Sequence, residues 1–206
     1  MQTPTPKTVR SALSVIFLTR NGQQIILVST FKYLGFLIDD HLSFKEHIQY
    51  MVKKLKLLLG FYYRNKSCFS FCVKQKLVDT TFMPVIDYGD VLYRKASASC
   101  LSMLDSVYHG ELRFITKCGP LTHHCELYAK VSWTSLSARR LSHWYVFIYK
   151  IILGIGPSYL SCLLTRKNGS HNLRSLDTLQ FVVPRVRSEL GKKAFRFSAP
   201  DAWNKL

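Results

Sequence analysis

Apolar residues recur at helical spacing between residues 44 and 62, and this stripe limits the possible folds more than any other feature of the chain. Its members are Phe44, Ile48, Met51, Val52, Leu55, Leu59 and Tyr62. Because residues three or four positions apart share one face of an α-helix, the pattern predicts a long helix with one buried face. Ser43 and Glu46 have the spacing of a capping box, which predicts that the helix begins at this point.

Further helices are expected downstream of this stripe. Residues 70–83 form a segment that Pro84 stops, and residues 84–93 are apolar enough for a short helix. Apolar stripes from Leu101 to Ile115 and from Leu141 to Ile152 predict two longer helices. A chain of 206 residues is long enough to bury these faces in a core of its own.

The region before the first helix has strand signals. Leu13–Leu18 is largely apolar, the dipeptide Asn21-Gly22 favours a hairpin turn, and Gln24–Ser29 is expected to return as the partner strand. Phe31–Ile38 is expected to be a third strand, covered on both faces because nearly all of it is apolar.

A second pair of strands is expected near the C-terminus, at Leu179–Val183 and Ala194–Phe197, after a polar loop over residues 166–178. The predicted fold class is therefore α+β and mainly α. It consists of a small N-terminal antiparallel sheet, a helical middle and a short C-terminal β-hairpin.

The chain is strongly basic, with 29 lysine and arginine residues against 12 aspartate and glutamate residues and a formal net charge of +17. Such an excess repels itself, and polyanions relieve the repulsion. RNA or DNA is therefore the expected partner. A solvated basic surface is the alternative, and an anionic membrane is disfavoured because no lipidation signal is present.

Cysteine usage and hydropathy give the expected location. Six cysteines in this length are too few for a disulfide scaffold. No apolar run of the secretory type follows Met1, and the longest apolar stretch, Tyr145–Gly156, is too short for a transmembrane helix. An intracellular location, in the nucleus or the cytoplasm, is expected.

One cluster contains the residue types that bind zinc, namely Cys118, His123, His124 and Cys125. Their spacing differs from the two-plus-two arrangement of common zinc fingers, and no second pair follows. We therefore predict no metal site here and keep zinc binding as an open alternative.

An ordered series of short phrases extends over nearly the whole chain. The phrases are Phe31–Asp39, Leu42–Phe44, His47-Ile48, Gly60–Lys66, Pro84–Tyr93, Leu112–Thr116, Thr122–Cys125, Trp133–Leu136, Arg139-Arg140, Phe197–Pro200 and Trp203-Asn204. In this order they resemble the region downstream of the polymerase palm in the reverse transcriptases of non-LTR (LINE-type) retrotransposons. Each phrase alone is a weak signal, whereas the ordered series is a specific one.

The resemblance implies three parts. Residues 1–42 are similar to the edge of the palm, with Tyr33-Leu34-Gly35 in a primer-grip-like strand. Residues 43–95 resemble the helical thumb, which holds the primer–template duplex. Residues 96–206 resemble a helical C-terminal extension that ends in the predicted hairpin.

The carboxylates needed for polymerisation are absent from this sequence. Polymerases hold two divalent metals with carboxylates, and reverse transcriptases place two of these in a Tyr-x-Asp-Asp hairpin, which the chain lacks. Asp39-Asp40 is the only adjacent acidic pair, and its position predicts a turn ahead of the helix rather than a metal site. We expect no catalytic residues and no cofactor in this fragment, whereas the parent enzyme would use magnesium.

Basic residues are the remaining candidates, because lysine and arginine neutralise phosphates. The candidates are Lys45, Lys53, Lys54 and Lys56 on the thumb-like helix, Arg64 and Lys66 at its end, and Arg139 and Arg140 as a second patch. Tyr62 and Tyr63, beside Arg64, either stack on bases or pack in the core. Two other interpretations remain open: a degenerate open reading frame without selected function, and a helical protein-interaction adaptor.

Overall fold

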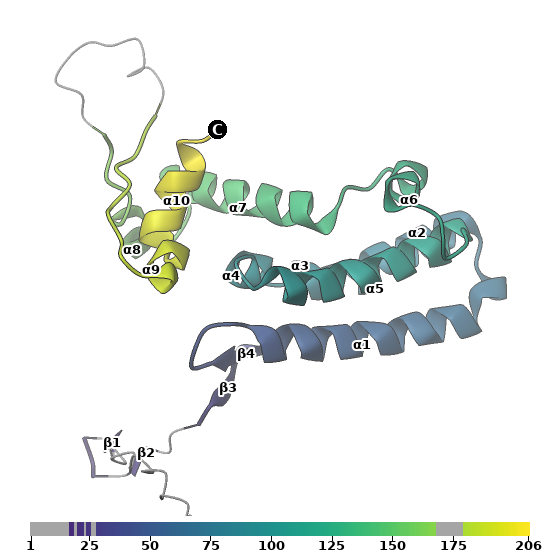
Figure 1. Cartoon of the computed structure of the whole chain (residues 1–206), viewed down its shortest axis with the longest axis horizontal. Helices are drawn as coiled ribbons and strands as arrows, with labels where there is room; N and C mark the ends of the chain where they lie inside the picture. The colour runs from purple at the N-terminus through teal and green to yellow at the C-terminus, as the bar shows by residue number, and fades with distance from the viewer. Residues whose placement is uncertain (1–16, 19, 23, 26–27, 168–178) are drawn as a thin grey trace, which may run out of the picture.

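The computed structural model describes residues 17–18, 20–22, 24–25, 28–167 and 179–206. Within these residues the chain is mainly helical, with two small antiparallel hairpins before the first long helix (Figure 1). The predicted class, α+β and mainly α, is confirmed.

The elements follow one another in a simple order. Strand β1 (Phe17–Leu18) pairs with β2 (Gln24–Ile25), and β3 (Thr30–Tyr33) pairs with β4 (Phe36–Asp39). The helices are α1 (Lys45–Arg64), the 3-10 helix η1 (Lys66–Cys68), α2 (Phe71–Thr81), α3 (Met83–Asp87), α4 (Asp90–Tyr93), α5 (Ala98–Thr116), α6 (His124–Val131), α7 (Leu136–Ile152), α8 (Ser158–Ser161), α9 (Glu189–Lys193) and α10 (Phe195–Trp203).

Helices α1 and α5 lie side by side, and their facing surfaces contribute much of the main core (Figure 1). The apolar stripe of α1 faces this core as predicted: Ile48 and Leu55 are fully buried, and Tyr62 is almost so. Each such side chain removed from water contributes on the order of 2 kcal/mol. The core also includes residues of α2, α3 and α6, so it crosses the predicted boundary between residues 95 and 96.

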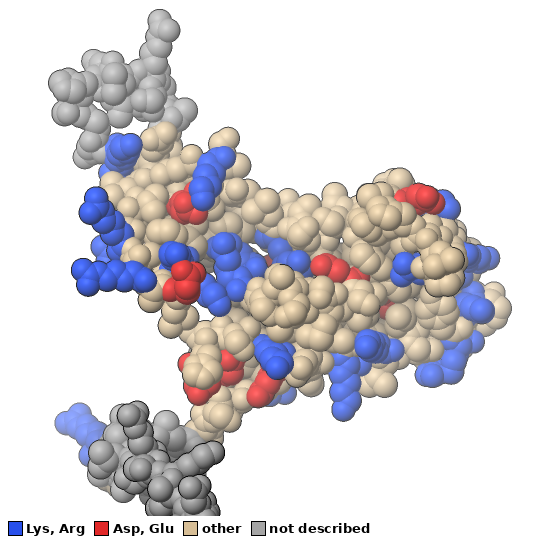
Figure 2. Space-filling model, in the orientation of Figure 1, with Lys and Arg blue, Asp and Glu red and all other residues tan. Residues whose placement is uncertain are grey.

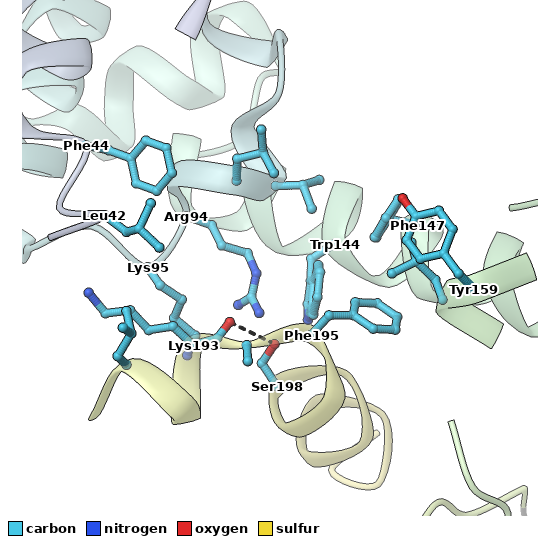
Figure 3. A pocket seen from close by; sticks show the side chains of 15 residues that line it. Leu42, Phe44, Arg94, Lys95, Trp144, Phe147, Tyr159, Lys193, Phe195 and Ser198 are labelled. Carbon is cyan, nitrogen blue, oxygen red and sulfur yellow. Dashed lines mark hydrogen bonds between the residues drawn. The ribbon is translucent and has the colours of Figure 1, made fainter. Parts of the chain in front are cut away.

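Helix α7 extends from the main core to a second, smaller one (Figure 1). There Trp144 and Ile148 of α7 pack with Ala199 of α10. A mostly apolar groove of about 490 Å³ lies between α4, α7 and the C-terminal helices (Figure 3). Inside it, the guanidinium of Arg94 lies 3.6 Å from the centre of the Trp144 ring, and this cation–π contact ties the end of α4 to α7.

The predicted single strand Phe31–Ile38 is wrong, because the segment folds back on itself as β3 and β4. Leu34 and Gly35, with φ values of +46° and +87°, form the two-residue turn between the strands. Two successive left-handed residues match the right-handed twist of a hairpin. Coverage on both faces is wrong as well, since Phe31 is exposed while Phe36 is buried against α1 and α4.

Helix α1 begins without the predicted capping box. Its N-terminal cap residue is Phe44, which has a left-handed φ of +57°. The carboxylate of Asp39 accepts hydrogen bonds from the backbone N–H groups of Ser43 and Phe44 at 2.9 and 2.8 Å. Glu46 instead accepts a hydrogen bond from the hydroxyl of Thr30 at 2.8 Å, because the hairpin brings β3 beside the start of the helix.

The predicted C-terminal β-hairpin is also wrong. Its second strand, Ala194–Phe197, forms the cap and first turn of α10 instead. In the described part of this region, strand pairing is limited to an isolated bridge between Arg166 and Phe181. Phe195 and Ala199 lie four residues apart, as helical packing requires, and both contact the core formed with α7.

The remaining expectations are met within limits. The predicted helix over residues 70–83 corresponds to α2, which ends at Thr81, and residues 84–93 contain most of α3 and all of α4. The two long stripes form α5 and α7, whereas α6 is not among the predicted helices. Residues 13–16 and 26–27 of the first predicted strand pair, and 168–178 of the predicted loop, lie outside the described residues. No helix in the described part combines the length and hydrophobicity of a membrane span.

Candidate nucleic-acid interface

The face of α1 that points away from the main core has a mixed basic and apolar surface. We define the outer stripe of α1 as Tyr50, Lys53, Lys54, Leu57, Phe61 and Arg64, all of which are exposed. Leu57 is 71% exposed and Phe61 is 50% exposed. Spacings of three or four residues place these side chains along one side of the helix. At 1.5 Å per residue, the outer stripe extends over about 20 Å.

The orientation of the outer stripe follows from the buried face of the same helix. Because Ile48 and Leu55 point into the core beside α5, residues about half a helical turn away must point into solvent. Lys45 and Lys56 flank the outer stripe and are exposed, and Lys66 follows in η1, also exposed. The structure thus gathers six of the eight predicted basic residues on α1 and the turn that follows it.

This surface is positively charged because almost no acid accompanies its lysines. The single acidic residue of α1 is Glu46, which accepts a hydrogen bond from Thr30 at the far end of the helix. Within the described residues, none of the basic groups of α1 forms an ion pair. Figure 2 shows lysine and arginine side chains gathered along this edge and at the end of the molecule where α1 stops.

The aromatic residues beside Arg64 differ in exposure, and this decides which of them can contact a base. Tyr62 is buried, and its hydroxyl forms a hydrogen bond with Thr81, so its stacking on bases is excluded in this fold. Tyr63 is partly exposed and contacts the ring of Phe114 edge-on. Phe61 was not singled out, although its spacing of eleven residues from Tyr50 would have placed it on the exposed face.

The predicted second patch, Arg139 and Arg140, stays a prediction, and the structure gives its two side chains different surroundings. Arg139 donates to both carboxylate oxygens of Asp87, from Nε at 2.7 Å and from Nη2 at 2.6 Å. The hydrogen bonds to Asp87 raise the pKa of Arg139 above its usual value. Arg140 is only 6% exposed. Arg139 is thus held by Asp87 and Arg140 is largely removed from solvent, so this pair is a weaker candidate than the outer stripe.

A neighbouring hydrogen bond joins α7 to α4. His143 Nδ1 lies 2.6 Å from the carboxylate of Asp90, a buried residue at the start of α4. Burial raises the pKa of Asp90, and the hydrogen bond with His143 opposes that rise. Asp87, Asp90 and His143 form a compact group of metal-binding residue types. Because both carboxylate oxygens of Asp87 accept hydrogen bonds from Arg139, we explain the group as a hydrogen-bonded connection between α3, α4 and α7.

The primer-grip-like residues Tyr33-Leu34-Gly35 form the tip of the β3–β4 hairpin, where Tyr33 and Leu34 are exposed. The Leu34 carbonyl accepts a hydrogen bond from the hydroxyl of Tyr88 at 2.7 Å, and the Tyr88 ring stacks on Phe36. These contacts fix the hairpin against the helices. The ammonium of Lys32 lies 6.0 Å from the ring of Tyr50, so the hairpin meets the start of the outer stripe.

The candidate zinc ligands are only partly brought together. His123, His124 and Cys125 place one ligand atom each within 4.8 Å of the others. Cys118 lies outside that group, and its sulfur accepts a hydrogen bond from Lys130 Nζ at 3.1 Å. The four residues therefore do not form one tetrahedral set in this arrangement.

The adjacent acids Asp39 and Asp40 have the structural role that the sequence predicts for them. Burial alone would raise the pKa of Asp39, but the hydrogen bonds from Ser43 and Phe44 lower it below its usual value. Asp40 is exposed and lies beside His41. The pair forms a turn and the entry to α1.

The outer stripe is therefore the strongest candidate site among the residues singled out from the sequence. Comparison of the chain with protein-family models, with curated proteins and with solved structures finds no match. The function of this surface has to be inferred from its own geometry and chemistry.

Proposed function

We propose that this chain binds nucleic acid along the outer stripe of α1, and that it is a non-catalytic fragment of the non-LTR reverse transcriptase type. The observation that carries the binding proposal is the combination of Lys53, Lys54 and Arg64 with exposed Tyr50 and Phe61 on one acid-free helix face. The resemblance of the ordered sequence phrases supports the assignment to a thumb-like part, in which such a helix would contact the primer–template duplex.

The chemistry of the outer stripe fits phosphate contact without sequence readout. Lysine and arginine neutralise backbone phosphates and release condensed counterions, which gives an affinity that falls with salt. An exposed length of about 20 Å corresponds to about six base-pair steps of a duplex, at about 3.4 Å each. The rings of Tyr50 and Phe61 are exposed to solvent and offer stacking platforms for unpaired bases at a strand end.

The proposal assigns no polymerisation to this chain by itself. The sequence lacks a Tyr-x-Asp-Asp motif, and the carboxylate of Asp39 is used to hold the start of α1. In a parent enzyme, magnesium-binding carboxylates would come from other residues. Action inside the cell, on RNA or DNA, follows from the proposed partner.

A binding titration with matched charge removal tests the proposal. The wild type and a triple variant, Lys53→Gln, Lys54→Gln and Arg64→Gln, are titrated into a fluorescent RNA–DNA hybrid at several salt concentrations. Loss of three phosphate contacts should weaken binding and lower the slope of log K against log salt by about 2 to 3.

The control removes the same net charge elsewhere. Lys150→Gln, Lys167→Gln and Arg185→Gln change exposed cations on α7 and in the C-terminal part. The control variant should retain most of the wild-type slope. Equal slopes in the two triple variants would show that only net charge matters, and absence of binding at low salt would refute the proposal.

A further inference from the structure

A second group of cations surrounds a cavity of about 440 Å³ beside the C-terminal end of α1. Lys66 of η1, Lys74 of α2, Arg113 of α5 and Lys117 at the end of α5 all line it. Among the described residues that line this cavity, none is acidic. We call it the four-cation cavity. It is a different feature from the outer stripe, and only Lys66 was singled out from the sequence.

Lys74 is the residue that makes this cavity unusual. Its side chain is only 1% exposed, and its ammonium lies 4.9 Å from the centre of the Phe114 ring. Within the described residues it has no hydrogen bond and no ion pair; its charge faces that ring and the cavity. Burial lowers its pKa, and the positive charges of Lys117 and Lys66 lower it further.

Arg113 adds a buried donor without a partner to the same cavity. Its Nε atom is buried and has no hydrogen-bond partner among the described residues. A buried donor or charge without a partner lowers the stability of a fold. An anion in the cavity would supply partners to both side chains and relieve the repulsion among the four cations at once.

The number and type of donors favour a phosphate over a smaller or singly charged anion. A phosphomonoester carries close to two negative charges and three terminal oxygens, which can be shared among several cations. Lysine offers three rotatable donors and arginine a planar fork, the donor set that proteins use for phosphate. Tyr63, which lines the cavity and is partly exposed, adds a ring that a sugar or base can contact.

We propose that the four-cation cavity binds a phosphomonoester, either on a free nucleotide or at the end of a polynucleotide strand. Binding of free phosphate goes beyond the proposed function and does not depend on it. Binding of a strand end rests on the proposed function, because the outer stripe would hold the same strand.

The first test measures phosphate binding directly. Inorganic phosphate and adenosine monophosphate are titrated by calorimetry at constant ionic strength, with adenosine and chloride as reference ligands. The wild type should bind both phosphates but neither reference. Lys74→Met should bind them more weakly by about tenfold or more, the effect of losing one charge-assisted hydrogen bond.

A matched control separates the cavity from net charge. Lys76→Met makes the same chemical change two residues away, at an exposed position of α2 that does not line this cavity. It should bind phosphate as the wild type does. Equal phosphate affinity in the Lys74→Met variant, or no phosphate binding by the folded wild type, would overturn the proposal.

The second test identifies the source of the phosphate. Oligonucleotides with a 5′-phosphate and with a 5′-hydroxyl are compared in the wild type and in the Lys74→Met variant. A preference for the 5′-phosphate that disappears in the variant supports strand-end binding. Calorimetric phosphate binding without such a preference supports the free nucleotide and refutes the strand end. Lys74→Met leaves the outer stripe unchanged, so the two proposals can fail separately. An outer-stripe variant that binds oligonucleotides as the wild type does would count against the proposed function and would leave the cavity proposal intact.

Discussion

Replacing Glu111 with methionine should change the pH dependence of stability, and the burial of Glu111 sets the sign of that change. Glu111 lies on α5 and is fully buried. Both of its carboxylate oxygens lack a hydrogen-bond partner among the described residues. Burial raises the pKa of Glu111 from 4.5 to about 8. In the folded chain the side chain therefore keeps its proton near neutral pH.

The sign follows from proton binding. Between about pH 4.5 and about pH 8 the unfolded chain releases the Glu111 proton while the folded chain retains it. The contribution of Glu111 to stability is thus complete below about pH 4.5 and falls as pH rises to about 8. At about 1.4 kcal/mol per pH unit, the full loss is about 5 kcal/mol, an amount comparable to the total stability of many domains.

The Glu111→Met variant removes this ionisable group and keeps a side chain of similar length. Its free energy of unfolding should be nearly free of this slope, so its advantage over the wild type should grow by up to about 4 kcal/mol between about pH 5 and about pH 8. Urea unfolding followed by tryptophan fluorescence measures the difference at each pH. Glu126→Met, at an exposed position on α6, is the control and should follow the wild type. Parallel curves for the wild type and Glu111→Met would refute the reasoning.

Three further predictions follow from particular contacts. Gly89→Ala should destabilise the fold by about 3 kcal/mol, because the residue has a φ of +62° and the added Cβ would overlap the ring of buried Phe36. Urea unfolding measures the change, and an unchanged midpoint would contradict this. Arg139→Met should lower the free energy of unfolding by about 1 kcal/mol, because the partly exposed bidentate pair with Asp87 is lost. In a double-mutant cycle with Asp87→Asn, most of this loss should appear as coupling energy, and additive effects would count against the pair. Phe61→Ser should leave thermal stability nearly unchanged. It should weaken the binding of single-stranded nucleic acid more than that of a duplex, by about 1 kcal/mol for one lost stacking contact. Equal weakening of the two would argue against stacking.

The buried face of α1 could be predicted from the sequence alone, because several apolar residues repeat at the helical period of 3.6 residues and together define one face. Ile48, Leu55 and Tyr62 point into the core as their spacing requires. The positions of Lys53 and Lys54 on the opposite side follow from the same periodicity. The mainly helical class followed from several such stripes in succession.

Strand and helix assignments in the short segments depended on packing that the sequence does not show. Ala194–Phe197 is apolar except for Arg196, as a short strand can be, yet it begins α10 because Phe195 packs against Trp144 and Phe147 of α7. Phe31–Ile38 is apolar except for Lys32, but Leu34 and Gly35 turn the chain back on itself. In both cases the local pattern fits two structures, and contacts with distant residues decide between them.

The fate of individual charges was decided by the tertiary structure alone. Arg139 and Lys53 are both expected on exposed helix faces from the sequence. In the folded chain, however, Arg139 donates a hydrogen bond to the carboxylate of Asp87, 52 residues away. Lys74 has no distinguishing neighbours in the sequence, yet the fold buries it beside Phe114 and facing a cavity. The sequence fixes how many charges a chain has and which helix face they occupy. Which of them remain free for a ligand depends on partners that only folding brings within a few ångströms. A hydrogen bond requires that distance, and a Coulomb attraction weakens as the two charges separate.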